Sequence, residues 1–146
     1  MKKVKKTLMV LITAFLLTLG FAGISTNEAS AKVWHGKPGL LYTTWYADGY
    51  FSNYVVVAKT FTRQQPGYGY IGMSVKATSK AKGSFTAYLQ KKSGSSWVTV
   101  KTYKAARNGT TSLSYSDAKK ATYRFKFVNT GSKTRVNYVF SVTQAR

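Results

Sequence analysis

The sequence predicts an all-β protein, in which one antiparallel β-sandwich or jelly-roll-like domain of about eight short strands follows an N-terminal secretion signal. Three observations support this fold class. Apolar and polar residues alternate with a period of two from about residue 40 onward. The alternating segments are short and are separated by Gly-, Asn-, Pro- and Ser-containing turns. Aromatic and β-branched residues are abundant, and no segment has a convincing helical period. A small β-barrel is the alternative architecture.

Residues 1–31 have the three parts of a cleavable signal peptide. A lysine-rich start is followed by a nearly continuous apolar run over residues 8–21 and then by Ala29 and Ala31, the small residues that signal peptidase prefers before its cut. We therefore expect cleavage after Ala31 and a mature domain over residues 32–146. An uncleaved membrane anchor is the alternative, but the apolar run is shorter than the ~20 residues that a span needs. The lysines and the long apolar run resemble a Gram-positive signal.

Eight segments of the mature domain predict strands. Residues 70–77 show the pattern most clearly, because Ile71, Met73 and Val75 fall on one face and Ser74 and Lys76 on the other. Turns are expected at residues 47–49, which contain Asp-Gly, and at residues 107–109, which contain Asn-Gly. The predicted strands cover residues 40–46, 50–61, 70–77, 85–90, 97–103, 111–115, 123–127 and 136–142.

The charge balance is the most unusual property of the sequence. The whole chain has 23 Lys and Arg against three acidic residues, and the predicted mature domain has 19 against two, a net charge of +17. Its aromatic content is too high for a disordered chain, so we expect a folded domain that attracts polyanions. Since the chain has no cysteine, disulfides, thiolate metal sites and a lipid-modified cysteine are excluded.

The mature domain has too few titratable residues for an enzyme to be expected. General acid–base catalysis requires positioned carboxylates or histidines, and the domain offers only His35, Asp48 and Asp117. We expect both aspartates in turns, where Asp is favoured for conformational reasons, and an exposed His35 near a mobile N-terminus. The sequence predicts no catalytic residues, no metal site and no cofactor, because a tetrahedral zinc site alone needs three or four ligands.

The candidate binding residues combine basic and aromatic side chains on predicted solvent-facing strand positions. Lysine and arginine attract phosphate or carboxylate groups, while flat rings stack on sugars or bases. A lysine-rich exterior can also simply protect strand edges, and surface rings can be half-packed under long side chains. Loop lysines are expected to add a basic rim at the ends of the domain. The candidate site consists of Tyr88, Trp97, Lys101, Tyr103, Arg124 and Lys126, with Trp97, Lys101 and Tyr103 in one row along a single strand.

These observations favour a secreted, extracellular binding protein without enzymatic activity. Our leading hypothesis is association with anionic polymers of the cell envelope, teichoic acid or peptidoglycan, because a Gram-positive secreted protein meets them first. A cationic antimicrobial or toxin-like protein at anionic membranes is the alternative, and the aromatic region around Trp45 and Phe51 would be its interfacial patch unless it is strand core. An extracellular nucleic-acid or matrix binder is a weaker alternative, since no recognition motif is present.

Overall fold

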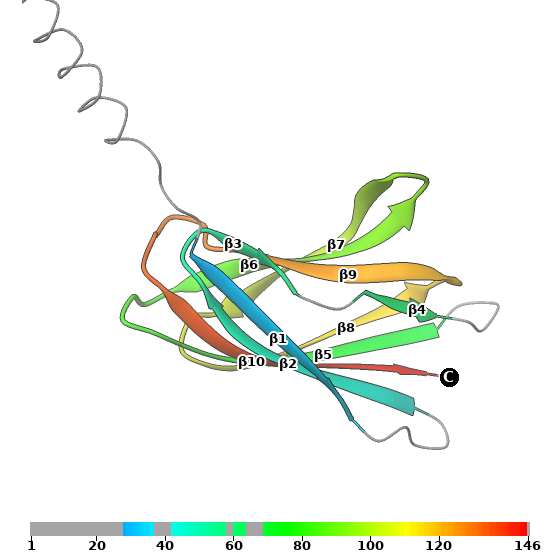
Figure 1. The fold of residues 1–146 in the computed structure, drawn as a ribbon, viewed down its shortest axis with the longest axis horizontal. Coiled ribbons are helices and arrows are strands. Elements are labelled where there is room, and N and C mark those ends of the chain that lie inside the picture. Colours follow the sequence, from blue (N-terminus) through cyan, green and yellow to red (C-terminus); the bar gives the residue numbers. More distant parts are fainter. Residues whose placement is uncertain (1–27, 37–41, 58–59, 64–68, 146) are drawn as a thin grey trace, which may run out of the picture.

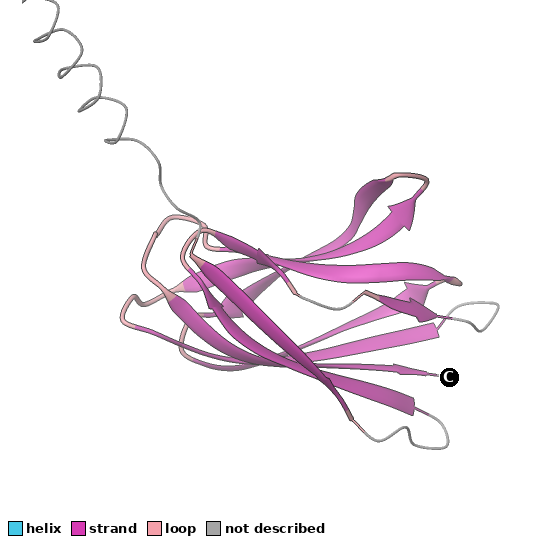
Figure 2. Ribbon diagram, in the orientation of Figure 1, coloured by secondary structure: helices cyan, strands magenta, loops and turns pink. Residues whose placement is uncertain are grey.

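The computed structural model describes residues 28–36, 42–57, 60–63 and 69–145, and every regular element in these ranges is a β-strand (Figure 2). The predicted signal peptide therefore lies outside the described residues except for its last four positions. No helix within the described ranges is long and apolar enough to cross a membrane. The strands are β1 (Ala29–His35), β2 (Tyr42–Phe51), β3 (Tyr54–Val56), β4 (Phe61–Arg63), β5 (Gly69–Ser79), β6 (Ser84–Ser93), β7 (Ser96–Ala106), β8 (Gly109–Ala118), β9 (Ala121–Val128) and β10 (Val136–Ala145).

The strands form two antiparallel sheets that pack face to face (Figure 1). Sheet A has the order β1-β2-β10-β5-β8, and sheet B has the order β3-β9-β6-β7 with β4 also paired to β9. Taking β3 and β4 as one interrupted strand and β1 as an addition, this order is that of a jelly roll. The predicted sandwich or jelly roll is confirmed.

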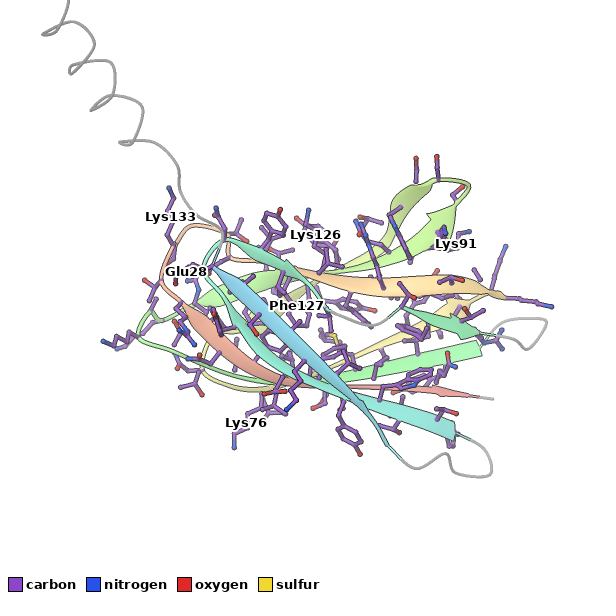
Figure 3. All side chains as sticks on the ribbon, viewed as in Figure 1. Glu28, Lys76, Lys91, Lys126, Phe127 and Lys133 are labelled. Atoms are coloured by element: carbon purple, nitrogen blue, oxygen red, sulfur yellow. The ribbon has the colours of Figure 1, made fainter. Side chains whose placement is uncertain are left out.

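The core is the layer of alternating apolar side chains between the two sheets. Phe51, Phe85 and Phe127 are completely buried, and their ring centroids lie 5.4–6.1 Å apart. Tyr138 and Phe140 of sheet A meet Phe127 of sheet B at 5.3 and 5.4 Å with nearly perpendicular rings. Edge-to-face aromatic contacts of this kind add to the stabilisation that comes from burying the rings. In Figure 3, Phe127 lies between the sheets.

One end of the sandwich is held by a buried arginine. Arg107 is 6% exposed and donates hydrogen bonds to Asn129 Oδ1 at 3.0 Å, to the Lys82 carbonyl at 2.8 Å and to the Thr130 carbonyl at 2.7 Å. Asn129 in turn donates to the backbone of Ser52 and to that of the β9–β10 turn. This network joins four connections, because Arg107 of the β7–β8 turn donates to the β5–β6 and β9–β10 connections and Asn129 donates to the β2–β3 connection.

The structure corrects two predicted strands in the N-terminal half. The predicted turn at residues 47–49 is wrong, because β2 continues through Asp48 and Gly49 and pairs with β1 on one side and β10 on the other. Gly49 serves close approach instead of turning: a Cβ there would lie 1.8 Å from the Ser30 carbonyl oxygen. The predicted strand over residues 50–61 is divided into the end of β2, then β3, and the first residue of β4.

β1 was not predicted as a strand, and it begins inside the predicted signal peptide. Lys32 pairs with Asp48, while Ala29 and Ser30 pair with the last two residues of β2. Cleavage after Ala31 would therefore cut within this paired strand, and the cleavage position stays a prediction. The predicted turn position of Asp117 is also wrong, because Asp117 lies inside β8.

Candidate functional site

The charges of the strands are divided unequally between the two sheets. The five strands of sheet B carry seven Lys or Arg residues and no acidic residue. The five strands of sheet A carry two lysines, Lys32 and Lys76, and two acids, Asp48 and Asp117. The strands of sheet B are therefore the uncompensated basic part of the fold.

The outer face of sheet B brings four of the six candidate residues together. Lys126 of β9 pairs with Tyr88 of β6, and Arg124 pairs with Gln90 on the same strands. These positions point outward because Phe125 and Phe127, which alternate with them, are buried in the core. We call this surface, made of the outward side chains of β3, β9, β6 and β7, the sheet B face.

Arg124 is held in one orientation on the sheet B face. Its guanidinium carbon lies 4.2 Å from the ring centroid of Trp97, and its Nε donates a 2.8 Å hydrogen bond to Gln90 Oε1. Gln90 then donates to Thr99 Oγ1 at 3.3 Å, so that the chain of contacts crosses from β9 to β7. Burial lowers the pKa of Arg124, but a guanidinium stays charged at neutral pH.

Lys126 and Tyr88 occupy the middle of the same face. The Lys126 ammonium lies 4.9 Å from the ring centroid of Tyr54, an exposed side chain of β3. Tyr88 lies between Lys126 on β9 and Thr102 on β7, and its side chain is half-buried. Cations and rings on neighbouring strands thus alternate across the sheet.

A β-bulge in β7 separates the other two candidates from this face. Thr99 pairs with Gln90, but Lys101 pairs with the buried Leu89, and the register shifts between these two pairs. An extra residue reverses the side to which later side chains point. Trp97 and Thr99 therefore lie on the sheet B face, while Lys101 and Tyr103 point to the opposite side of β7, so the predicted single row is wrong.

Tyr103 packs against the core instead of lying on the outer face. It donates a 2.7 Å hydrogen bond to the Ser114 carbonyl oxygen of β8 and so links the edges of the two sheets. Burial is the main cause that raises the pKa of Tyr103 to about 12, with smaller effects from Tyr115 and Tyr70.

Sequence reasoning missed Tyr54 and Lys104 of the sheet B face. Lys104 donates a 3.2 Å hydrogen bond to the hydroxyl of Thr86, which is 3% exposed. Lys104 comes after the β-bulge in β7. Strict alternation counted from Trp97 places Lys104 on the core side of the strand, whereas the extra residue turns it to the sheet B face. Tyr54 could have been found, because Tyr54 and Val56 flank the buried Val55 in an alternating segment.

The other sequence expectations concern the two aspartates, metal ligands, His35 and the aromatic region around Trp45. The row of paired residues that starts at Asp48 on β2 crosses β10 and β5 and reaches Thr110 on β8. Asp117 lies seven residues further along β8, so the two aspartates are too far apart to form a carboxylate pair. The described residues contain no group of three or more His, Cys, Asp or Glu that could hold a metal. The side chain of His35 lies outside the described residues. Phe51 is core, and Trp45 packs against Phe61 at 5.4 Å, as the alternative interpretation of the aromatic region expected.

Comparisons with known proteins find similar folds only. No protein-family model and no curated protein match the chain. A solved structure titled "CBM4 structure and function" is 14% identical, covers 82% of this chain and 77% of its own, and has a TM-score of 0.46. PirA is 16% identical, the match covers 85% of this chain and 100% of PirA, and the TM-score is 0.42. A pilus protein of Bacillus endospore appendages is 10% identical, with 85% of this chain and 94% of that chain covered and a TM-score of 0.40. At these values the likeness concerns the β-sandwich and assigns no ligand.

Proposed function

We propose that this protein is a secreted, non-enzymatic binding protein that associates with anionic polymers of the cell envelope, teichoic acid or peptidoglycan, through the sheet B face. The observation that carries the proposal is the fixed Arg124 between Trp97 and Gln90, beside Lys126 and Tyr88 on strands that contain no acid. Secretion and wall association are part of the proposal and rest on the predicted signal peptide.

The contacts of Arg124 leave its anion-binding atoms available. Its Nε is used by Gln90, and its two terminal nitrogens have no acceptor among the described residues. A guanidinium presents parallel N–H donors that match the oxygens of phosphate or carboxylate. Because Trp97 and Gln90 already contact the guanidinium, little side-chain freedom remains to be lost on binding.

The arrangement across the strands favours a long ligand. The basic and aromatic residues lie on β3, β9, β6 and β7, so a polymer crossing these strands would meet a cation at more than one repeat. Lys126 supplies a second charge, and Tyr88 offers a ring against which a sugar can pack. Binding of this kind needs charge and surface rings, and it needs no catalytic group.

The test is retention of the purified protein on isolated Gram-positive cell walls, intact or stripped of teichoic acid, over a sodium chloride gradient. Counterion release makes such binding fall steeply with salt. The test variant is Arg124→Gln/Lys126→Gln. The control variant is Lys120→Gln/Lys133→Gln, which removes the same charge from exposed turns at the two ends of β9. Thermal unfolding of each variant shows whether the fold is retained.

We expect the test variant to lose roughly 30-fold in retention, since each basic group near an anionic surface contributes ~1 kcal/mol, and the control to lose much less. Equal losses in both variants would mean that net charge alone acts and that the sheet B face is not the site. No retention of the wild-type protein at low salt would refute the proposal. Dye leakage from anionic vesicles would then test the membrane alternative.

A further inference from the structure

The outer face of sheet A is hollowed, on the side of the molecule opposite the sheet B face. In Figure 3, Lys76 of β5 and Lys126 of β9 project away from each other on the two sides of the sandwich. A groove of about 580 Å³ lies here, and its lining includes Asp48 and Tyr50 of β2, Lys76 of β5 and Arg135 beside β10. We call it the sheet A groove.

Arg135 is fixed over the sheet A groove by contacts much like those of Arg124. Its guanidinium carbon lies 3.6 Å from the ring centroid of Tyr50, and its Nε donates a 3.1 Å hydrogen bond to Asn137 Oδ1. Asn137 pairs with Tyr50 of β2 and with Thr78 of β5, and all three line the groove. The groove thus contains a positioned cation.

An acid distinguishes the sheet A groove from the sheet B face. Asp48 pairs with Val139, which pairs with Lys76, so the carboxylate and the ammonium belong to one row across the sheet. Asp48 Oδ1 is buried and has no hydrogen-bond donor among the described residues. A carboxylate with an unpaired oxygen favours a ligand that brings hydrogen-bond donors, and it repels a ligand that is anionic throughout.

Hydroxyl groups continue from this groove along the same face. A neighbouring hollow of about 320 Å³ is lined by Tyr70, Ser74, Ser141 and Thr143. Ser74 pairs with Ser141 on the row next to Asp48, Val139 and Lys76. The Tyr70 ring covers Gly72, where a Cβ would lie 2.7 Å from the ring. Exposed tyrosine rings and hydroxyls in one strip suit the faces and hydroxyls of sugar rings.

We infer that the sheet A groove is a second binding site and that it takes an acidic saccharide. The carboxylate or phosphate of the sugar lies between Lys76 and Arg135, and ring hydroxyls donate to Asp48. Asn137 and Thr78 supply further polar contacts. This site is independent of the sheet B face, and the two together would allow one molecule to bridge two polymer chains.

The predicted maturation of the chain changes one wall of the groove only. Ser30 and Lys32 of β1 contribute to the lining, while the residues that carry the inference belong to β2, β5, β10 and the turn before β10. Cleavage after Ala31 would remove Ser30 and widen the groove at this wall, leaving Asp48, Lys76 and Arg135 in place.

The test is titration of the ¹⁵N-labelled protein with tetragalacturonate, with tetrapolyphosphate as an anionic probe that lacks sugar rings. We expect amide shifts from tetragalacturonate on β2, β5 and β10. Lys76→Gln/Arg135→Gln should weaken tetragalacturonate binding about tenfold or more. Lys120→Gln/Lys133→Gln, which removes the same charge from exposed turns outside the groove, should change tetragalacturonate binding less than about twofold.

Asp48→Asn separates a saccharide site from a purely electrostatic one by the sign of its effects. It should weaken the binding of tetragalacturonate, because the protein loses a carboxylate that accepts hydrogen bonds from the sugar hydroxyls. It should strengthen the binding of tetrapolyphosphate, because the protein loses a negative charge that repels this anion. Stronger binding of both probes would overturn the inference, as would amide shifts confined to β9, β6 and β7. Neither result touches the proposed function, which depends on the sheet B face and on wall retention.

Discussion

The two outer faces of this sandwich hold their arginines alike but differ in what surrounds them. On the sheet B face, Arg124 lies against Trp97 on acid-free strands; on the other face, Arg135 lies against Tyr50 in a groove that also contains Asp48. A face with cations alone attracts any polyanion, whereas a cation beside an acid discriminates between anions. The net charge of the chain would not reveal this difference, because it averages the two faces.

The largest expected effect is on the bridging of polymer chains, which requires that both faces of one protein molecule bind polymer. If each face binds polymer, the wild-type protein should clump an acidic polysaccharide such as polygalacturonate, because one protein molecule can hold two polymer chains at once. Arg124→Gln/Lys126→Gln and Lys76→Gln/Arg135→Gln have equal net charge, and each should lower light scattering about tenfold or more while soluble binding persists. Clumping that survives in both variants would contradict the two-face arrangement.

The wall of the sheet A groove can be tested at Gly49, which pairs with Ala31 of β1 and lines the groove. In a chain that begins at Glu28, Gly49→Ala should lower the free energy of unfolding by about 2–3 kcal/mol, because the new Cβ meets the Ser30 carbonyl at 1.8 Å. A chain that begins at Lys32 lacks the Ser30 carbonyl, and the next atom that the Cβ would meet is the Tyr138 hydroxyl oxygen at 3.0 Å, so we expect a loss below about 1 kcal/mol. Urea unfolding of both chains measures this.

Equal losses in the two chains would show that the close approach of Ser30 is not what requires glycine at this position. Mass spectrometry of the protein from culture medium gives the cleavage position independently. The expected result is the mass of a chain that begins at Lys32.

The bulge in β7 predicts unequal effects of two similar lysines. Lys126→Gln should reduce wall retention roughly fivefold, since it removes a cation from the sheet B face. Lys101→Gln removes the same charge from the other side of β7, and we expect a loss below about twofold. A larger loss at Lys101 would restore the single row that strict alternation of the sequence predicts.

Alternation predicted the parts of the molecule in which each strand has one buried face. Ile71, Met73 and Val75 are buried as expected, and Arg124 and Lys126 point outward because they alternate with core aromatics. The same rule failed where the backbone departs from regular pairing. One extra residue in β7 moved Lys101 and Tyr103 off the face, and Asp48 could not be placed in a strand without knowledge of β1.

The groove of sheet A could not be predicted because its residues are distant in sequence. Tyr50, Lys76 and Arg135 meet only through the pairing of β10 with both β2 and β5, which depends on the order of strands in the sheet. The sheet B face was easier, because β6 and β7 form a hairpin and β9 pairs beside them.

The smallest effect is expected at Tyr103, whose hydrogen bond to Ser114 joins the edges of the two sheets. Burial is the main reason that the pKa of Tyr103 is about 12 in the folded protein, above the ordinary tyrosine value of 10.0. Between these two values the unfolded chain loses the phenol proton while the folded chain retains it, so stability falls as pH rises from 10 to 12. Tyr103→Phe should lose about 1 kcal/mol at pH 7 with the hydrogen bond. The same variant should show a shallower fall of the urea midpoint with pH across that window. A slope equal to that of the wild type would mean that Tyr103 is solvated and does not join the edges of the two sheets.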